Sequence, residues 1–134
     1  MKSVALPEVL RRQILEEARA ALPGECCGLV EGFLESDAYR VTALHPARNL
    51  AAKPDRFEIA SEDHFQAFKA ARAGGHRLIG CYHSHPNGRA EPSAADKAGG
   101  GEENFLWLIA AGESLQAFVY RRGEFSAVGW MTPA

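Results

Sequence analysis

The sequence lacks the features that mark exported, membrane-spanning and nucleic-acid-binding proteins. Its N-terminus turns charged after Pro7, without the apolar run and small-residue cleavage site of a signal peptide. No apolar stretch approaches the roughly 20 residues that a membrane-spanning helix needs. The formal net charge is -2 and no long run carries one sign, so no electrostatic surface for nucleic acid or for an anionic membrane is expected. We therefore expect a cytoplasmic protein.

Cysteine is also scarce, with Cys26, Cys27 and Cys81 the only three in the chain. An odd number of cysteines without an export signal favours free thiols in a reducing compartment. The adjacent pair is not the Cys-x-x-Cys of a structural zinc site. We interpret the three cysteines as small buried apolar residues.

What the chain does have is the composition of an ordinary globular protein, with 46% hydrophobic and 24% charged residues in 134. This length predicts a single domain over residues 1–134. A domain of this size buries about two thirds of the surface that its unfolded chain exposes. It therefore needs no disulfide in order to fold.

Hydrophobic periodicity and turn residues predict an α/β domain in which helices pack on one mixed β-sheet. Helices are predicted over 7–22 and 61–73, the second capped by Ser61, and a short helix begins near Ser93. Strands are predicted over 26–34, 39–44, 57–59, 77–83, 105–110, 115–120 and 124–130. A loop is predicted over 45–56, and a tight turn at Arg122-Gly123.

The stretch Tyr82-His83-Ser84-His85-Pro86 carries the clearest chemical signal. Two histidines two apart on a strand point to the same side, so their imidazoles could converge on one ion. Pro86 then breaks the strand, and the following loop is long enough to fold back and bring the Asp96 carboxylate to the same point. A catalytic zinc typically has three protein ligands and an open fourth position, so His83, His85 and Asp96 are a candidate ligand set.

Strand alternation makes a further prediction for this segment. It places Leu78, Gly80 and Tyr82 on one face, and Ile79, Cys81 and His83 on the other.

Hydrolysis at zinc also needs a carboxylate that takes a proton from water and returns it to the leaving amine. Glu25 is the leading candidate, because it lies where a helix has ended and a strand begins. Ser93 could donate its hydroxyl to the developing oxyanion. Each residue also has a plainer interpretation. The histidines can be a hydrogen-bonded pair, Ser93 and Asp96 fit a helix cap, and Glu25 alone suits a solvated turn.

Taken together, these residues resemble the JAMM/MPN+ metalloprotease family. That family carries a glutamate upstream of a Cys-Gly strand, then His-x-His, seven residues, Ser, two residues and Asp. This sequence reads Glu25-Cys26-Cys27-Gly28, then His83-Ser84-His85, seven residues to Ser93 and two more to Asp96. Asn49, Pro54 and Phe57-Glu58-Ile59 resemble its middle segment. The resemblance runs from about Leu6 to Gly129 and is closest to the short bacterial and archaeal members. Cys81 departs from it, because an aromatic residue often precedes the tyrosine.

The resemblance implies a fold like that of cytidine deaminases, with a curved mixed β-sheet flanked by helices. It implies that His83, His85 and Asp96 hold Zn²⁺, that Glu25 activates water, and that Ser93 stabilises the oxyanion. Small prokaryotic relatives process the C-terminal Gly-Gly tails of ubiquitin-like sulfur-carrier proteins. The expected function is therefore that of a zinc-dependent peptidase or isopeptidase acting on the tail of a ubiquitin-like or sulfur-carrier protein.

Two other functions stay open at this point. Two histidines and a carboxylate also describe non-haem iron enzymes, although their usual His-x-Asp or His-x-Glu order is missing. The family also includes non-catalytic members that have lost metal ligands and bind proteins, whereas all five positions are present here. The zinc deaminase pattern of His-x-Glu and Pro-Cys-x-x-Cys is absent.

The remaining histidines and the glycine run are not expected to take part in catalysis or metal binding. His45, His64 and His76 have no evident partner and are expected on the surface or in loops. The Gly99-Gly100-Gly101 run has no phosphate-loop pattern and is expected to be a flexible turn that borders the substrate groove.

Overall fold

The computed structural model describes residues 3–51, 53 and 56–131, so Pro54 lies outside the described residues. Its strands are β1 (Ser3–Ala5), β2 (Cys27–Glu35), β3 (Ala38–Ala47), β4 (Arg77–Ser84), β5 (Leu106–Ala111), β6 (Ser114–Arg121) and β7 (Glu124–Trp130). Its helices are α1 (Glu8–Ala21), α2 (Ser61–Ala73) and α3 (Ala94–Gly99). No helix among the described residues is long and apolar enough to cross a membrane.

The strands form one mixed sheet that closes into a barrel in the order β1-β3-β2-β4-β5-β6-β7. The strands β2, β3 and β4 pair antiparallel, as do β5, β6 and β7. The two groups join where β4 and β5 pair in parallel, and α3 lies in the connection between them. The short strand β1 closes the barrel by pairing with both β3 and β7.

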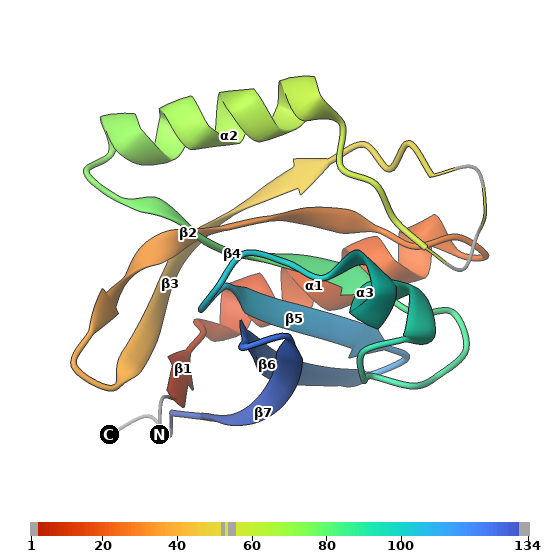
Figure 1. Ribbon diagram of the computed structural model, residues 1–134. Coiled ribbons are helices and arrows are strands. Elements are labelled where there is room, and N and C mark those ends of the chain that lie inside the picture. Colours follow the sequence, from red (N-terminus) through yellow and green to blue (C-terminus); the bar gives the residue numbers. More distant parts are fainter. Residues whose placement is uncertain (1–2, 52, 54–55, 132–134) are drawn as a thin grey trace.

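The two long helices cover opposite faces of this sheet (Figure 1). Helix α1 packs on β4, β5 and β6 and buries Ile14, Leu15 and Ala18 in the main core. Helix α2 packs on β2, β3 and β4 and buries only the small side chains of Ala67 and Ala71. The sheet face under α2 therefore keeps room beside the helix, and the site described below opens on that side.

A β-bulge in β4 corrects the predicted alternation of its side chains. Val30 of β2 pairs with Gly80, but Glu31 pairs with Leu78, so Ile79 is the extra residue. A bulge of this kind reverses which face the preceding side chains occupy. Ile79 therefore joins Tyr82 in the core under α1, and Leu78 packs with Cys81 on the opposite side.

Three further predictions were wrong in ways that long-range contacts explain. Strand β3 continues through His45 to Ala47, because its last residues pair with the start of β2. Residues 57–59 form only an isolated bridge between Asn49 and Ile59, since the Asn49 side chain accepts the hydrogen bond of the Glu58 N–H. Ser61 is the first helical residue rather than the cap of α2, and Ala60 precedes it. The sequence also gave no sign of β1.

The other predicted elements are confirmed within one to three residues. The turn between β6 and β7 is of the predicted kind, with positive φ at both Arg122 (52°) and Gly123 (79°), as a two-residue hairpin turn requires.

Candidate metal centre

Strand β4 and its parallel neighbour fix the two histidines of the His-x-His segment. His83 pairs with Ile109 inside the ladder. His85 lies just beyond the strand, where its N–H still donates to the Ala110 carbonyl at 2.8 Å. Both side chains are buried, with 0% of His83 and 5% of His85 exposed. Their imidazoles lie on the same side of the sheet, as the spacing predicts.

A capping box at the start of α3 fixes the Asp96 carboxylate. The Ser93 hydroxyl oxygen accepts a hydrogen bond from the Asp96 N–H at 3.0 Å, and Asp96 Oδ2 accepts one from the Ser93 N–H at 2.9 Å. This reciprocal pair stops rotation of the carboxylate at the helix N-terminus. The predicted cap and the predicted ligand position are therefore compatible, because the cap orients the carboxylate.

The three side chains meet at one point. His83 Nε2 lies 2.9 Å from His85 Nε2, and Asp96 Oδ2 lies 3.1 Å from each of these nitrogens. Three atoms so spaced can all lie about 2.0–2.2 Å from a common ion, which is the usual distance of zinc to nitrogen and oxygen ligands.

Hydrogen bonds alone cannot satisfy this triangle while both histidines are neutral. His85 Nδ1 donates to the Arg89 carbonyl at 2.9 Å, so a neutral His85 has no hydrogen left on Nε2. His83 Nε2 can then donate along only one of its two edges, and the lone pairs of His85 and Asp96 face each other. A cation among the three atoms removes this repulsion, which makes the donor set suited to a metal ion.

The pKa shifts of Asp96 and His83 favour the forms that bind a metal, whereas that of His85 favours its protonated form. Burial would raise the pKa of Asp96, but the hydrogen bonds with the two histidines outweigh it and hold that pKa well below its usual range. Burial lowers the pKa of His83. Burial also acts to lower the pKa of His85, yet Asp96 and the Arg89 carbonyl raise it overall. Asp96 is therefore ionised and His83 neutral, the forms in which each binds a metal.

Glu25 lies beside this triangle. One ligand atom each from Glu25, His83 and His85 lie within 4.8 Å of one another, and only 5% of Glu25 is exposed. Glu25 and His85 also line a pocket of about 490 Å³ together with Ser93. The structure thus brings all five predicted residues to one place, with Glu25 and Ser93 facing the same open space.

Two residues that position Glu25 were missed as functional residues in the sequence. The Asn49 side chain donates to the Glu25 carbonyl at 3.0 Å and so ties the 49–58 loop to it. Ser84, the middle residue of His-x-His, accepts a hydrogen bond from the Cys26 N–H at 2.9 Å through its hydroxyl oxygen. The spacing of His-x-His gives no signal for Ser84, because its side chain lies on the face away from the ligands.

An aromatic wall also lies behind His83. The Phe57 ring stacks on its imidazole at 4.3 Å between centroids, and Trp107 meets it edge-on at 5.6 Å. These contacts hold the imidazole plane and exclude water from one side of it. Phe57 precedes α2 and Trp107 lies on β5, so only the tertiary fold brings them to the histidine.

The cysteines are free thiols, as predicted. Burial raises the pKa of Cys26 to about 11 and that of Cys27 to about 12, and it raises the pKa of Cys81 as well. All three therefore stay protonated near neutral pH, which does not suit a nucleophile.

Two of the remaining histidines have a partner that the sequence did not suggest. His45 Nε2 lies 2.8 Å from one oxygen of the buried Glu31 carboxylate, and His76 Nδ1 lies 2.9 Å from the other. The three residues come from β3, β2 and the residue before β4, which only the sheet brings together. His64 is exposed on α2, as predicted.

Comparisons with known proteins place these observations in a family. The family model described as prokaryotic homologues of the JAB domain matches residues 7–122. The desampylase of Haloferax volcanii is 36% identical over 106 residues, which are 75% of this chain and 75% of that protein. A solution structure of a Desulfitobacterium hafniense protein matches with a TM-score of 0.86 at 28% identity, over 96% of this chain and 91% of that one. A JAB1/MPN domain protein from Archaeoglobus fulgidus shares the fold, with a TM-score of 0.54 at 18% identity over 98% of each chain.

Proposed function

This chain belongs to the family of prokaryotic homologues of the JAB domain, and from that membership we propose a zinc-dependent peptidase or isopeptidase. The proposed substrate is the C-terminal tail of a ubiquitin-like or sulfur-carrier protein. The observation that carries the proposal is the triangle of His83 Nε2, His85 Nε2 and Asp96 Oδ2, whose edges are 2.9 and 3.1 Å. A buried carboxylate, that of Glu25, stands beside it.

Each residue then has a role that follows from its position. His83, His85 and Asp96 would hold the ion. Bound zinc would supply a Lewis acid and lower the pKa of water. Glu25 takes a proton from the attacking water and returns it to the departing amine. The Ser93 hydroxyl oxygen already accepts the Asp96 N–H, so its hydrogen remains available to donate to the oxyanion that develops on the carbonyl.

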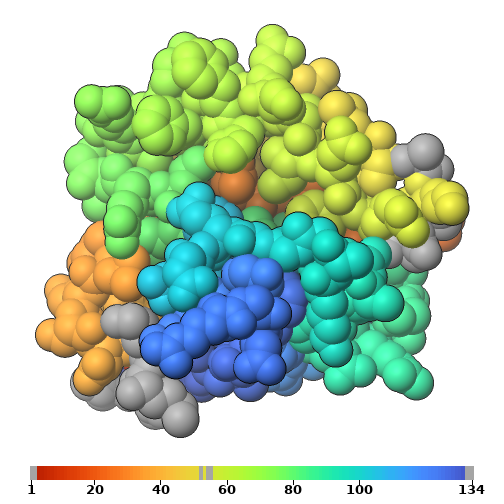
Figure 2. Space-filling model, in the orientation of Figure 1, coloured from red at the N-terminus to blue at the C-terminus, as the bar shows by residue number. Residues whose placement is uncertain are grey.

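A groove on the same face supports a tail-shaped substrate. It has a volume of about 460 Å³ and is bounded by α2 and Phe57 on one side and by Gly101 and Trp107 on the other. Figure 2 shows it as a hollow across the face, between α2 and the segment that follows α3. The stacking of Phe57 on His83 makes the groove end at the metal centre. A narrow two-sided groove favours an extended chain with small side chains, such as a Gly-Gly tail.

Gly101 and Trp107 form one side of the groove. Gly101 borders the groove, whereas Gly99 of the same run is the last residue of α3 rather than part of a turn. A Cβ at Gly101 would lie 3.4 Å from the Trp107 indole nitrogen. That nitrogen is buried and has no hydrogen-bond partner within the described part of the chain. Gly101 lies over that nitrogen, so a tail in the groove would contact the indole ring rather than its N–H. The relative named desampylase supports a substrate of this class.

The first test is metal content, measured by elemental analysis on the parent chain and on His85→Ala. The matched control is His64→Ala, because His64 is exposed on α2. We expect about one zinc per chain in the parent and in the control, and none in His85→Ala. Iron in place of zinc would support the alternative of a non-haem iron enzyme. A chain that takes up no metal at all would leave the protein-binding module as the better function.

The second test is cleavage of a ubiquitin-like protein whose Gly-Gly tail carries a peptide extension or an isopeptide-linked lysine. Glu25→Gln keeps the size of the side chain and removes the base, so it should retain zinc and lose at least about a hundredfold in rate. Glu16→Gln, an exposed glutamate on α1, is the control and should cleave at the parent rate. Parent-like cleavage by Glu25→Gln would exclude the role assigned to Glu25.

A further inference from the structure

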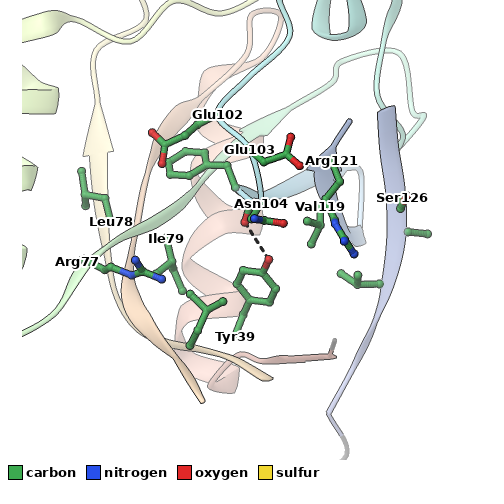
Figure 3. A pocket seen from close by; sticks show the side chains of 14 residues that line it. Tyr39, Arg77, Leu78, Ile79, Glu102, Glu103, Asn104, Val119, Arg121 and Ser126 are labelled. Atoms are coloured by element: carbon green, nitrogen blue, oxygen red, sulfur yellow. Dashed lines mark hydrogen bonds between the residues drawn. The ribbon is translucent and has the colours of Figure 1, made fainter. Parts of the chain in front are cut away.

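A second pocket lies at the other end of the barrel from the metal centre. It has a volume of about 590 Å³ and is built from β4, β6, β7 and the loop before β5, as Figure 3 shows from close by. This volume is in the range of pockets that hold small organic molecules. Along β4, His83 at the candidate metal centre lies six positions after Arg77 at this pocket, which is about 20 Å of extended strand.

The pocket exists because the sheet is incomplete at this end. Strand β4 pairs with β5 only from Gly80 onward, so the residues from Arg77 to Ile79 have no β5 partner. The strand β1 closes the barrel over only a few residues. The gap is floored by apolar side chains, among them Ile79, Val119 and Val128. The pocket adjoins the proposed substrate groove, because Arg77, Leu78, Glu102 and Phe105 line both cavities.

Two arginines reach into this pocket from opposite sides. Figure 3 shows Arg77 of β4 and Arg121 of β6 on opposite sides of Tyr39, whose hydroxyl donates to the Asn104 carbonyl at 2.8 Å. Burial raises the pKa of Tyr39, and Arg121 and then Arg77 oppose that rise, so both guanidinium groups act on the same spot. Neither arginine forms an ion pair within the described residues.

Two glutamates at the rim, Glu102 and Glu103, place negative charge near the two arginines. Glu103 accepts a hydrogen bond from the Arg122 N–H at 3.0 Å, which fixes the β6–β7 hairpin and with it Arg121. Glu102 lines the rim beside it, and Figure 3 shows both carboxylates on the far side of Asn104 from Tyr39. All four charged side chains are exposed, with the two arginines nearer Tyr39 and the two glutamates beyond Asn104. The pocket therefore carries no net formal charge, which disfavours polyanions and large anionic partners.

We propose that this pocket binds a small organic monoanion, a carboxylate with a compact apolar body. The carboxylate would lie between Arg77 and Arg121, whose planar guanidinium groups match it in shape and charge. The apolar body would cover Ile79, Val119 and Val128. The pocket adjoins the proposed substrate groove, but this proposal does not depend on the proposed hydrolase activity.

The test is an amide NMR titration of the full chain with phenylacetate and with its neutral amide, phenylacetamide. These probes share one apolar body and differ in charge. We expect saturable shifts at the backbone amides of Asn104, Val119 and Ser126 with phenylacetate, and binding at least about tenfold weaker for the amide. The titration is repeated in the His85→Ala variant, because a carboxylate can also bind a metal ion. The pocket shifts should be unchanged there.

Variants then test the residues. Arg77→Gln combined with Arg121→Gln should weaken phenylacetate binding about tenfold or more, and Arg72→Gln on the exposed face of α2 should not. Ser126→Trp, which fills the pocket without changing its charge, should also abolish binding. Glu102→Gln should tighten it by about two- to threefold, because a like charge is removed from the rim. Equal binding of the two probes, or an undiminished affinity in the double arginine variant, would overturn the proposal.

Discussion

Replacing Ser84 by alanine tests whether the far face of the His-x-His segment fixes Glu25, the proposed general base. Ser84 is buried, and its hydroxyl oxygen accepts the Cys26 N–H at 2.9 Å. A second bond between the same residues, from the Ser84 N–H to the Cys26 carbonyl at 3.2 Å, survives the substitution. Cys26, the residue before β2, would thus keep one of its two hydrogen bonds to Ser84, and Glu25 is the residue immediately before Cys26.

The size of the effect follows from the bond that is lost. A partly buried N–H left without its acceptor costs about 1–2 kcal/mol, which for a chain of this length lowers Tm by about 3–8 °C. The proposed ligands His83 and His85 lie on the face away from the Ser84 side chain, so the expected zinc content should not change. A shift of the Glu25 carboxylate by a fraction of an ångström should lower kcat by about tenfold, with little change in KM.

The measurements are calorimetric melting, metal analysis and cleavage kinetics on Ser84→Ala, with Ser114→Ala as the matched control. Ser114 is exposed at the start of β6, so its substitution should change stability by less than about 0.5 kcal/mol. If Ser84→Ala melted with the parent and cleaved at the parent rate, the hydroxyl of Ser84 would have no part in placing Glu25. Loss of zinc from Ser84→Ala would also contradict the reasoning, because it would mean that the ligand face had moved.

Three further predictions concern the fold and the groove. Burial acts to raise the pKa of Glu31, but His45 and His76 lower it overall. Its contribution to stability is therefore present above the unfolded pKa of about 4.3 and is lost as pH falls through the folded value. Glu31→Gln should cost about 1–3 kcal/mol at neutral pH and much less in acid, measured by denaturant unfolding. Gly80→Ala should destabilise by several kcal/mol, because its Cβ would overlap the Leu106 carbonyl. The control is Gly99→Ala, because a Cβ at Gly99 would meet no atom within 4 Å. Its midpoint of urea unfolding should change little. Trp107→Phe should raise KM for tailed substrates while Tm changes by only about 2–4 °C, which cleavage and melting assays would show.

Local patterns were sufficient to predict the parts of the site that depend on neighbouring residues. The spacing of His83 and His85 requires only strand alternation, and the two imidazoles do converge. The Ser93 cap requires only a helix start, and the capping box has both of its bonds. Glu25 could be placed at a helix-to-strand junction, but no local rule puts it near the histidines. Its place came from the family resemblance alone.

The parts that could not be predicted depend on pairing between distant strands. The bulge at Ile79 is defined by the pairing of β4 with β2. The residue types of β4 alone do not predict it. The Asn49 side chain donates a hydrogen bond to the Glu25 carbonyl, although the two residues are 24 positions apart in the sequence. Glu31 gathers His45 and His76 from two other segments, so the prediction that neither histidine had a partner was wrong. In each case the local residue types are compatible with several positions, and the sheet register selects one.

The same bulge accounts for the separation of the two pockets along β4. After Ile79 the strand alternates regularly, and Gly80 lets β5 approach so closely that parallel pairing begins there. That pairing fixes His83 on the face of α2 and α3. Before the bulge, β4 no longer follows β5, so Ile79 turns into the core and Arg77 lines the pocket beside Tyr39. The proposed metal centre and the proposed anion pocket therefore use different halves of one strand. Substitutions that change the charge of Arg77 should accordingly leave the geometry of His83 intact.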